Sequence, residues 1–155
     1  MRRKNFRYIN TSKSKKDKTY KGFLYKSRLE AYMAMLLDQN NLPLLYEKKT
    51  FTIFKRLPES IGVYRKTTKN TGDYKLRDSV LNSVKYTPDF IDDNLKQPNA
   101  FIIECKGRPD AVFMLRFKLF QRYCNKYHPD VKLYMPRNLT QCRQTIDLIL
   151  KHRKT

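Results

Sequence analysis

The sequence predicts an α/β fold, in which helices pack against a central mixed sheet. The run AFIIECK at 100–106 has the length and the β-branched composition of a buried strand. Apolar residues recur with helical spacing before this run, at 29–37, and a second helix-like stretch follows it at 110–127. Alternating helices and strands in a chain of 155 residues indicate one domain with a modest core.

The first helix is expected to begin at Ser27 and to end near Asn40, before a proline at position 43. Its apolar residues fall at i, i+3, i+4, i+7 and i+8 and form one stripe: Leu29, Tyr32, Met33, Leu36 and Leu37. Glu30 lies three residues after Ser27, which is the spacing of a capping box. The carboxylate of Glu30 is therefore open to two roles, as a helix cap or as part of a site.

The next stretch, 45–54, alternates partly between polar and apolar residues and predicts a strand. Its acid, Glu47, is interpreted as a surface charge rather than a member of a site. Residues 55–83 are predicted to be an insertion that contains a β-hairpin, with its tip near 70–72 and a short apolar patch at 61–64.

Three charged residues lie at the ends of the two central strands, 84–90 and 100–106. Side chains alternate along a strand, so Phe101, Ile103 and Cys105 share one face, and Ile102, Glu104 and Lys106 share the other. Upstream, Thr87-Pro88-Asp89 breaks the first strand and brings a second carboxylate to the same edge of the sheet. Two carboxylates and a lysine can bind a hard divalent cation and activate a water molecule.

Each part of this pattern also has an ordinary structural interpretation. An aspartate after a proline is common in turns, and Glu104 with Lys106 could be a solvated pair on an edge strand. Burying such charged side chains lowers the stability of a fold, so it is uncommon where they have no function. Here the three residues occur together at the end of an otherwise apolar strand. The combination favours a catalytic site.

The remainder of the chain predicts a helix, a strand and a final basic helix. Asp110 is expected to cap the helix at 110–127. A short strand at 131–135 and a helix at 140–152 complete the series. Part of the inner face of the helix at 110–127 is predicted to consist of Val112, Leu115, Leu119 and Tyr123.

The charge of the chain indicates a polyanionic partner. The sequence has 34 Lys and Arg residues against 14 Asp and Glu residues, a net charge of +20. Nucleic acid is the first candidate and an anionic membrane the second, although no apolar run approaches the length of a membrane span. Residues 1–21 are predicted to be a flexible basic arm. The basic residues expected to contact phosphates are Lys21, Lys26, Arg28, Arg108, Arg116, Lys118 and Arg122.

Three cysteines, Cys105, Cys124 and Cys142, are widely spaced and include no Cys-x-x-Cys pair. An odd number of isolated cysteines favours free thiols in a reducing compartment, and it argues against a zinc ribbon or a disulfide scaffold. The sequence therefore predicts a cytoplasmic location.

These residues together resemble the PD-(D/E)xK nuclease superfamily. Within it, the chain is similar to the phage endonuclease I group of Holliday-junction resolvases, over roughly residues 23–135. Ser27-Arg28-Leu29-Glu30 is similar to that group's Ser-Gly-Leu-Glu. Tyr86-Thr87-Pro88-Asp89-Phe90 and Glu104-Cys105-Lys106-Gly107 match its two central motifs, and His128-Pro129-Asp130 is similar to the segment before its last core strand.

The resemblance implies a restriction-endonuclease-like αβββαβ core in residues 22–155, with 55–83 as an insertion. It implies one or two Mg²⁺ or Mn²⁺ ions per site, hydrolysis of DNA phosphodiesters that leaves a 5′-phosphate, a homodimer acting on branched duplex, and a phage or bacterial host cytoplasm. Asp89 and Glu104 would be metal ligands, Lys106 would position the water, and Glu30 would support a second metal. Two departures are Arg28 in place of glycine and the longer connection at 55–83.

Two alternatives remain. A restriction-like, repair or transposon-end nuclease would keep the fold and the chemistry but cleave a different DNA structure. A non-catalytic basic DNA- or RNA-binding protein would need the positive charge but not the buried acids.

Overall fold

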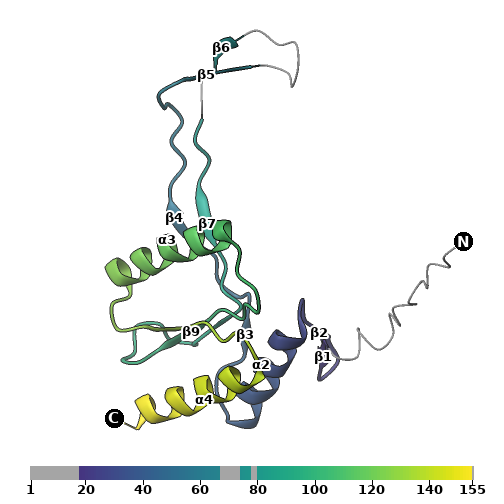
Figure 1. Ribbon diagram of the computed structural model, residues 1–155. Helices are drawn as coiled ribbons and strands as arrows, with labels where there is room; N and C mark the ends of the chain where they lie inside the picture. Colours follow the sequence, from purple (N-terminus) through teal and green to yellow (C-terminus); the bar gives the residue numbers. More distant parts are fainter. Residues whose placement is uncertain (1–17, 67–73, 78–79, 155) are drawn as a thin grey trace, which may run out of the picture.

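The computed structural model describes residues 18–66, 74–77 and 80–154 (Figure 1). The chain is a mixed α/β protein with a mixed central sheet, as the sequence predicts. This sheet has the strand order β10-β9-β8-β3, in which β9 and β10 are parallel and the other neighbours are antiparallel. Helix α3 covers one face of the sheet, and α2 and α4 cover the other (Figure 1).

Strand β9 (Phe101–Ile103) is buried on both faces, as its composition predicts. Phe101, Ile103 and Cys105 belong to the core cluster beneath α2 and α4, whereas Ile102 belongs to the cluster beneath α3. Strand β10 (Lys132–Tyr134) pairs with β9 in parallel, and β8 (Phe90–Ile91) pairs with it on the other side. The end of β9 is therefore held by neighbours on two edges and two faces.

Helix α2 (Arg28–Gln39) has the predicted bounds and stripe. Met33 and Leu37 are fully buried together with Ala31 and Ala34, while the other stripe residues are partly buried. The Ser27 side chain accepts a hydrogen bond from the Glu30 N–H at 3.1 Å and caps the helix. The chain leaves the helix through Asn41, whose φ of 53° is the left-handed conformation that ends many helices.

The strand predicted at 45–54 is two strands. Strand β3 (Leu45–Tyr46) pairs with β8 in the central sheet, and β4 (Phe51–Phe54) pairs with β7 (Val84–Tyr86) in a separate ribbon. Between them Glu47 has a φ of 44°, which a continuous strand cannot contain. The first central strand is divided in the same way, because residues 87–89 separate β7 from β8.

Helix α3 (Ala111–Tyr127) begins after Asp110, which accepts a hydrogen bond from the Phe113 N–H at 2.7 Å, as predicted. Its predicted inner face is right only at Tyr123, which packs against the core cluster beneath α3, whereas the other three predicted residues do not belong to that cluster. Val112 and Leu115 are 69% and 60% exposed, and Leu119 and Tyr123 are only partly buried. The buried stripe is Phe117, Phe120 and Cys124, with Phe113 partly buried beside it. The facing surface carries aromatic rings that stack on this stripe, including Tyr86, whose ring centre lies 4.4 Å from that of Phe120.

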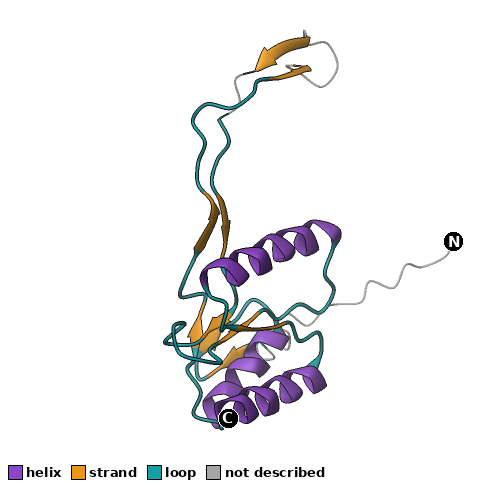
Figure 2. Cartoon of the chain, turned by 90° about the vertical axis from the view of Figure 1, so that its left-hand side faces the viewer, coloured by secondary structure: helices purple, strands orange, loops and turns teal. Residues whose placement is uncertain are grey.

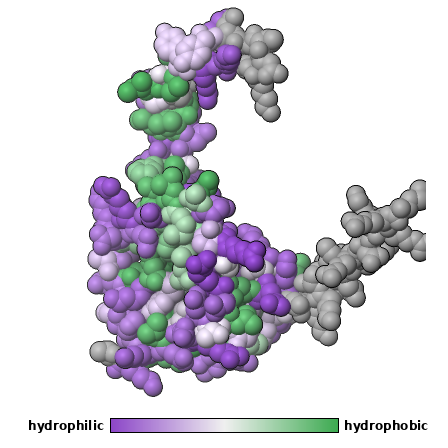
Figure 3. Space-filling model, in the orientation of Figure 1, coloured by the Kyte–Doolittle hydropathy of each residue, from purple (hydrophilic) through white to green (hydrophobic). Residues whose placement is uncertain are grey.

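Residues of the predicted insertion form a projecting hairpin that extends away from the core (Figure 2). The term projecting hairpin refers to residues 55–66, 74–77 and 80–83. Strands β5 (Val63–Lys66) and β6 (Tyr74–Arg77) are antiparallel, as predicted, and the predicted tip lies outside the described residues. Apolar side chains are exposed along the hairpin (Figure 3), among them Ile61, Val63, Tyr64, Tyr74 and Leu76.

The described end of the predicted basic arm is part of a second, short hairpin, which consists of β1 (Thr19–Tyr20) and β2 (Phe23–Leu24). Residues 1–17 of that arm lie outside the described part of the chain. None of the described helices is both long and apolar enough to cross a membrane.

Helix α4 (Leu139–Arg153) packs against α2 and closes the core through one buried ion pair. Asp92 is 1% exposed and accepts hydrogen bonds from Arg153 at 2.6 Å, Gln97 at 2.9 Å and the Phe101 N–H at 3.3 Å. Burial alone would raise the pKa of Asp92, but hydrogen bonds from the Asp93 N–H and from Arg153 hold it below its ordinary value. This carboxylate joins β8, β9 and α4.

We expect Arg153→Ala to lower the free energy of unfolding by about 2 kcal/mol at neutral pH, because a buried carboxylate loses its charged partner. The stabilisation is complete above the ordinary carboxyl pKa of about 3.9 and is lost as the pH falls through the lower folded-state pKa. Denaturant unfolding at neutral and acid pH measures the difference. Lys154→Ala, at the exposed neighbouring position, is the control, and an equal effect of both variants would contradict the role of the pair.

Candidate active site

Asp89 and Glu104 are brought together at the ends of β8 and β9. Asp89 is 8% exposed, and its Oδ2 accepts a hydrogen bond from the Cys105 N–H at 2.6 Å. Its backbone carbonyl accepts the Glu47 N–H at 2.8 Å. The carboxylate of Asp89 thus bonds to a strand end 16 residues away and not to its own turn. A role of Asp89 as an ordinary turn residue would account for the bend of the backbone after Pro88, but not for the burial of its side chain.

Glu104 is half-buried, and its carboxylate is not fully compensated. Its Oε2 and the nearby hydroxyl of Tyr86 are both buried, and neither has a hydrogen-bond partner. Burial raises the pKa of Glu104 to about 7, against the opposing effects of Tyr86 and the ammonium of Lys106. An unpaired buried carboxylate oxygen costs stability unless a donor or a cation reaches it.

The charge of Glu104 disfavours the ionised form of Asp89. Burial, followed by the negative charge of Glu104, raises the pKa of Asp89 to about 8, and the Cys105 hydrogen bond opposes this only in part. Glu30 raises the pKa of both acids as well, so its charge belongs to the same group. Three acidic side chains thus create an excess of negative charge in a buried region of a strongly basic protein.

Glu30 is fixed by two donors. It is 6% exposed, and its Oε2 accepts hydrogen bonds from the Tyr46 hydroxyl at 2.6 Å and from the Lys26 N–H at 3.1 Å. The helix cap is supplied by the side chain of Ser27, and the Glu30 carboxylate bonds to the N–H that precedes Ser27. Glu30 can therefore take part both in the helix cap and in the site. Its N–H bonds to the capping Ser27, while its carboxylate is close enough to Asp89 and Glu104 to raise their pKa values.

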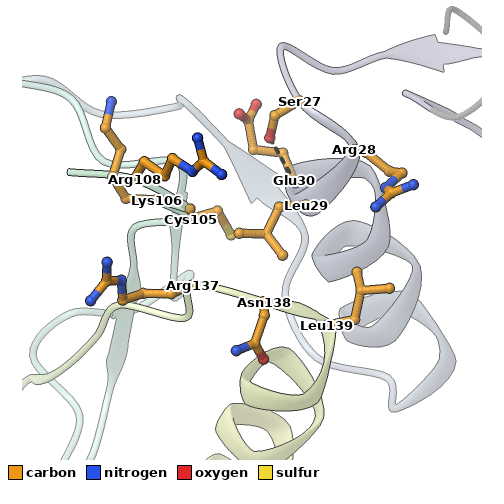
Figure 4. A pocket seen from close by; sticks show the side chains of 11 residues that line it. Ser27, Arg28, Leu29, Glu30, Cys105, Lys106, Arg108, Arg137, Asn138 and Leu139 are labelled. Atoms are coloured by element: carbon orange, nitrogen blue, oxygen red, sulfur yellow. Dashed lines mark hydrogen bonds between the residues drawn. The ribbon is translucent and has the colours of Figure 1, made fainter.

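Lys106 is half-buried between two cavities. Its Nζ lies 4.7 Å from the centre of the Phe113 ring, and its charge lowers the pKa of Glu104. The smaller cavity, about 300 Å³, is lined by Glu104, Lys106, Tyr86 and Arg116, among others. The larger cavity, about 530 Å³, has Lys106 and Glu30 in its wall (Figure 4).

The predicted phosphate-contacting residues divide into two groups. Arg28 and Arg108 line the larger cavity, and Arg116 lines the smaller one, where it also donates a hydrogen bond to the Lys85 carbonyl at 3.1 Å. The others lie away from both cavities. Lys21 forms an ion pair with Asp38 at 2.7 Å, Lys26 forms one with Glu47, and Lys118 and Arg122 lie on the exposed face of α3.

Sequence reasoning missed three residues at this place. Tyr46 orients Glu30, Tyr86 lies beside Glu104, and Arg137 lines the larger cavity just before α4. For Arg137 the sequence indicates only its position at the start of a helix, and not its place at the cavity. Asn138 caps the Gln141 N–H at 2.9 Å, and Gln141 returns a bond to the Arg137 N–H at 2.7 Å, so an Asn-x-x-Gln capping pattern marks the start of α4.

The residues present suit a hard divalent cation. Within the described residues, no group of three or more His, Cys, Asp or Glu side chains is arranged to hold a metal ion. Mg²⁺ commonly keeps several waters and needs only one or two carboxylates together with substrate phosphates. Asp89 and Glu104 supply two carboxylates, and the unpartnered Oε2 of Glu104 and the raised pKa values are what a cation would relieve.

We expect Asp89→Asn to stabilise the protein by roughly 1–3 kcal/mol at pH 9 in EDTA, because it removes an uncompensated buried charge. Because the folded-state pKa of Asp89 is raised, the stability that this residue contributes is fully present below about pH 4 and is lost as the pH rises through about 8. The two proteins should therefore converge in acid. Millimolar Mg²⁺ or Mn²⁺ should raise the melting temperature of wild type more than that of the variant.

Thermal unfolding from pH 4 to 9, with and without the cation, measures both effects. Asp93→Asn removes an exposed carboxylate near β8 and is the matched control. An Asp89→Asn protein that is less stable than wild type at every pH would show that the Asp89 charge is already compensated.

Comparisons of this chain with protein-family models, with curated proteins and with solved structures found no match. Its function must therefore be inferred from the geometry of the site itself. The observations that bear on it are the buried acid Asp89, the half-buried acid Glu104, the lysine beside them, and the two cavities that meet at that lysine.

Proposed function

We propose that this chain is a metal-dependent DNA endonuclease that hydrolyses phosphodiester bonds. The observation that carries the proposal is the pair of buried Asp89 and half-buried Glu104, undercompensated and next to Lys106, in a chain of net charge +20. The order α2, β3, β8, β9, α3, β10 in and around the central sheet supports the αβββαβ, restriction-endonuclease-like core expected from the resemblance.

Each residue of the group has a separate task in this proposal. Asp89 and Glu104 would hold one or two Mg²⁺ or Mn²⁺ ions, with Glu30 supporting the second. When bound, the cation would offset the charge of the scissile phosphate and lower the pKa of a bound water. Lys106 orients the attacking water or stabilises the negative charge that develops on the phosphoryl oxygens. Water adds to phosphorus, and the 3′ oxygen leaves, so the product carries a 5′-phosphate.

The basic side chains around the cavities supply the affinity for DNA. Arg28, Arg108 and Arg116 border the acidic group, and guanidinium groups bind phosphates in a bidentate manner. Their positive charge also opposes the repulsion between the acids and the DNA backbone.

The projecting hairpin supports a branched substrate and a homodimer. A two-stranded ribbon is marginally stable alone, yet this one exposes Tyr64, Tyr74 and Leu76, which share one face. A second copy of the chain would cover that face. Resolution of a four-way junction needs two cuts, and a C₂ dimer matches the symmetry of that junction.

Two other functions make different demands on this site. A restriction-like, repair or transposon-end nuclease would use the same acids and cut linear duplex as well as a junction. A non-catalytic binding protein would be weakened by acids that repel phosphate, so the buried Asp89 and the half-buried Glu104 argue against it.

We expect Asp89→Asn and Glu104→Gln to lower the cleavage rate at least about a thousandfold, because several kcal/mol of charge stabilisation are lost at about 1.4 kcal/mol per tenfold. DNA binding should persist or strengthen, since each change removes a negative charge near phosphate. Cleavage of a four-way junction, a linear duplex and a single strand in Mg²⁺ and in EDTA is the measurement. Asp130→Asn, at an exposed turn, is the control; turnover near wild type in either site variant would refute the assignment.

We expect the protein to be a dimer at micromolar concentration and to make paired nicks across a four-way junction. Tyr64→Glu with Leu76→Glu should give monomers that nick one strand at a time, because two charges would be buried in the interface. Light scattering and the ratio of single to paired cuts report the outcome. Arg65→Glu changes the neighbouring position, on the opposite face of β5, and serves as the control. A wild-type monomer that cuts linear duplex equally well would favour the alternative nuclease.

A further inference from the structure

The larger cavity is basic, although it adjoins the acidic group. It lies between the start of α2, the chain that follows β9 and the start of α4 (Figure 4). Of the side chains that line it, four are basic and one is acidic: Arg28, Lys106, Arg108 and Arg137 against Glu30. Its volume of about 530 Å³ is more than a single phosphate group requires and leaves room for an attached sugar.

The one acid does not neutralise these cations. The Oε2 of Glu30 is bonded to Tyr46 and to the Lys26 N–H, and its carboxylate lies on the side of the cavity away from Arg137 and Asn138 (Figure 4). The ion pairs found in the described part of the chain involve Lys21, Lys26 and Arg153, and none of the cavity's three arginines. The guanidinium groups at this cavity are therefore available to an anion.

The backbone adds to this positive potential. Helices α2 and α4 both begin at the cavity, after Ser27 and Asn138. Each cap satisfies one N–H in the first turn, that of Glu30 or of Gln141, and the earlier N–H groups of the turn remain for another acceptor. Two helix starts at one cavity strengthen the attraction that the arginines already exert on an anion.

Lys106 connects this cavity to the candidate active site. It lines both the larger cavity and the smaller cavity that contains Glu104, so the two cavities share one side chain as a common wall. A nucleic-acid strand that places one phosphate beside Glu104 can place a neighbouring phosphate in the larger cavity by passing Lys106. The larger cavity, with its free arginines, is the neighbouring anion site on that path.

We propose that the larger cavity binds the phosphodiester group next to the scissile phosphate on the cut strand, with Arg137 as a principal contact. The inference rests on the proposed nuclease function and assigns a substrate position to Arg137, a residue outside the acidic group. The Arg137 N–H is held by Gln141 at 2.7 Å, which fixes the backbone from which the guanidinium extends. Holding this phosphate would set the register of the strand in the site.

The test asks whether the loss of one side chain and the loss of one phosphate charge weaken DNA binding independently. Wild type, Arg137→Gln and Lys132→Gln are titrated in EDTA with a junction in which single linkages around the cut are replaced, one at a time, by neutral methylphosphonate. Lys132 is exposed at the opposite end of β10 and loses the same charge, so it is the matched control. Arg28→Gln, on another wall of the cavity, gives a second and independent variant.

For wild type and Lys132→Gln, we expect neutralisation of the linkage next to the cut to weaken binding roughly tenfold. For Arg137→Gln the same replacement should weaken binding less than twofold, because the contact is already lost. The salt slope of Arg137→Gln should fall by about one phosphate contact. Equal losses for Arg137→Gln and wild type at every linkage would overturn the inference, and metal-dependent cleavage by wild type would then leave the nuclease proposal intact. Absence of both binding and cleavage would overturn the two together.

Discussion

One hydrogen bond, from the Cys105 N–H to the carboxylate of Asp89, joins the two segments that carry the acids of the site. It requires that the end of β9 remain fixed, and β9 is fixed because both its faces and both its edges are covered. The site is thus an extension of the most buried strand of the protein. Loosening the packing on either face of β9 would move Glu104 and Asp89 relative to each other.

Two aspartates beside β8 differ in how far the fold compensates their charge. Asp92 is buried among hydrogen-bond donors and Arg153, which hold its pKa low. Asp89, three positions earlier, is nearly as buried but faces Glu104, and its pKa is raised. The fold stabilises the first charge and tolerates the second. Such an uncompensated charge is typical of functional sites, where stability is exchanged for reactivity.

The core and the acidic group were accessible to sequence reasoning because both depend on local patterns. The apolar run of β9, the stripe of α2 and the caps Ser27 and Asp110 each have a strong signal over a few residues. The inner face of α3 was not accessible, since two apolar stripes compete on that helix and the aromatic rings opposite decide between them. The division of the strand predicted at 45–54 was missed because it depends on a left-handed residue, Glu47, within a charged stretch. Arg137 joins the site only through the parallel pairing of β10 with β9, which is a long-range contact.

The division of those strands also gives the projecting hairpin a mechanical role. The hairpin is joined to the core by the ribbon of β4 and β7, which continues directly into the segments that lead to β3 and β8. At the core end of this ribbon, the Thr50 and Thr87 hydroxyls are hydrogen-bonded at 2.7 Å. Asp89 follows Thr87 by two positions. A partner that binds the projecting hairpin and displaces it would therefore also act on the β4–β7 ribbon. Because this ribbon leads into the chain beside Asp89, such a displacement would change the position of that carboxylate.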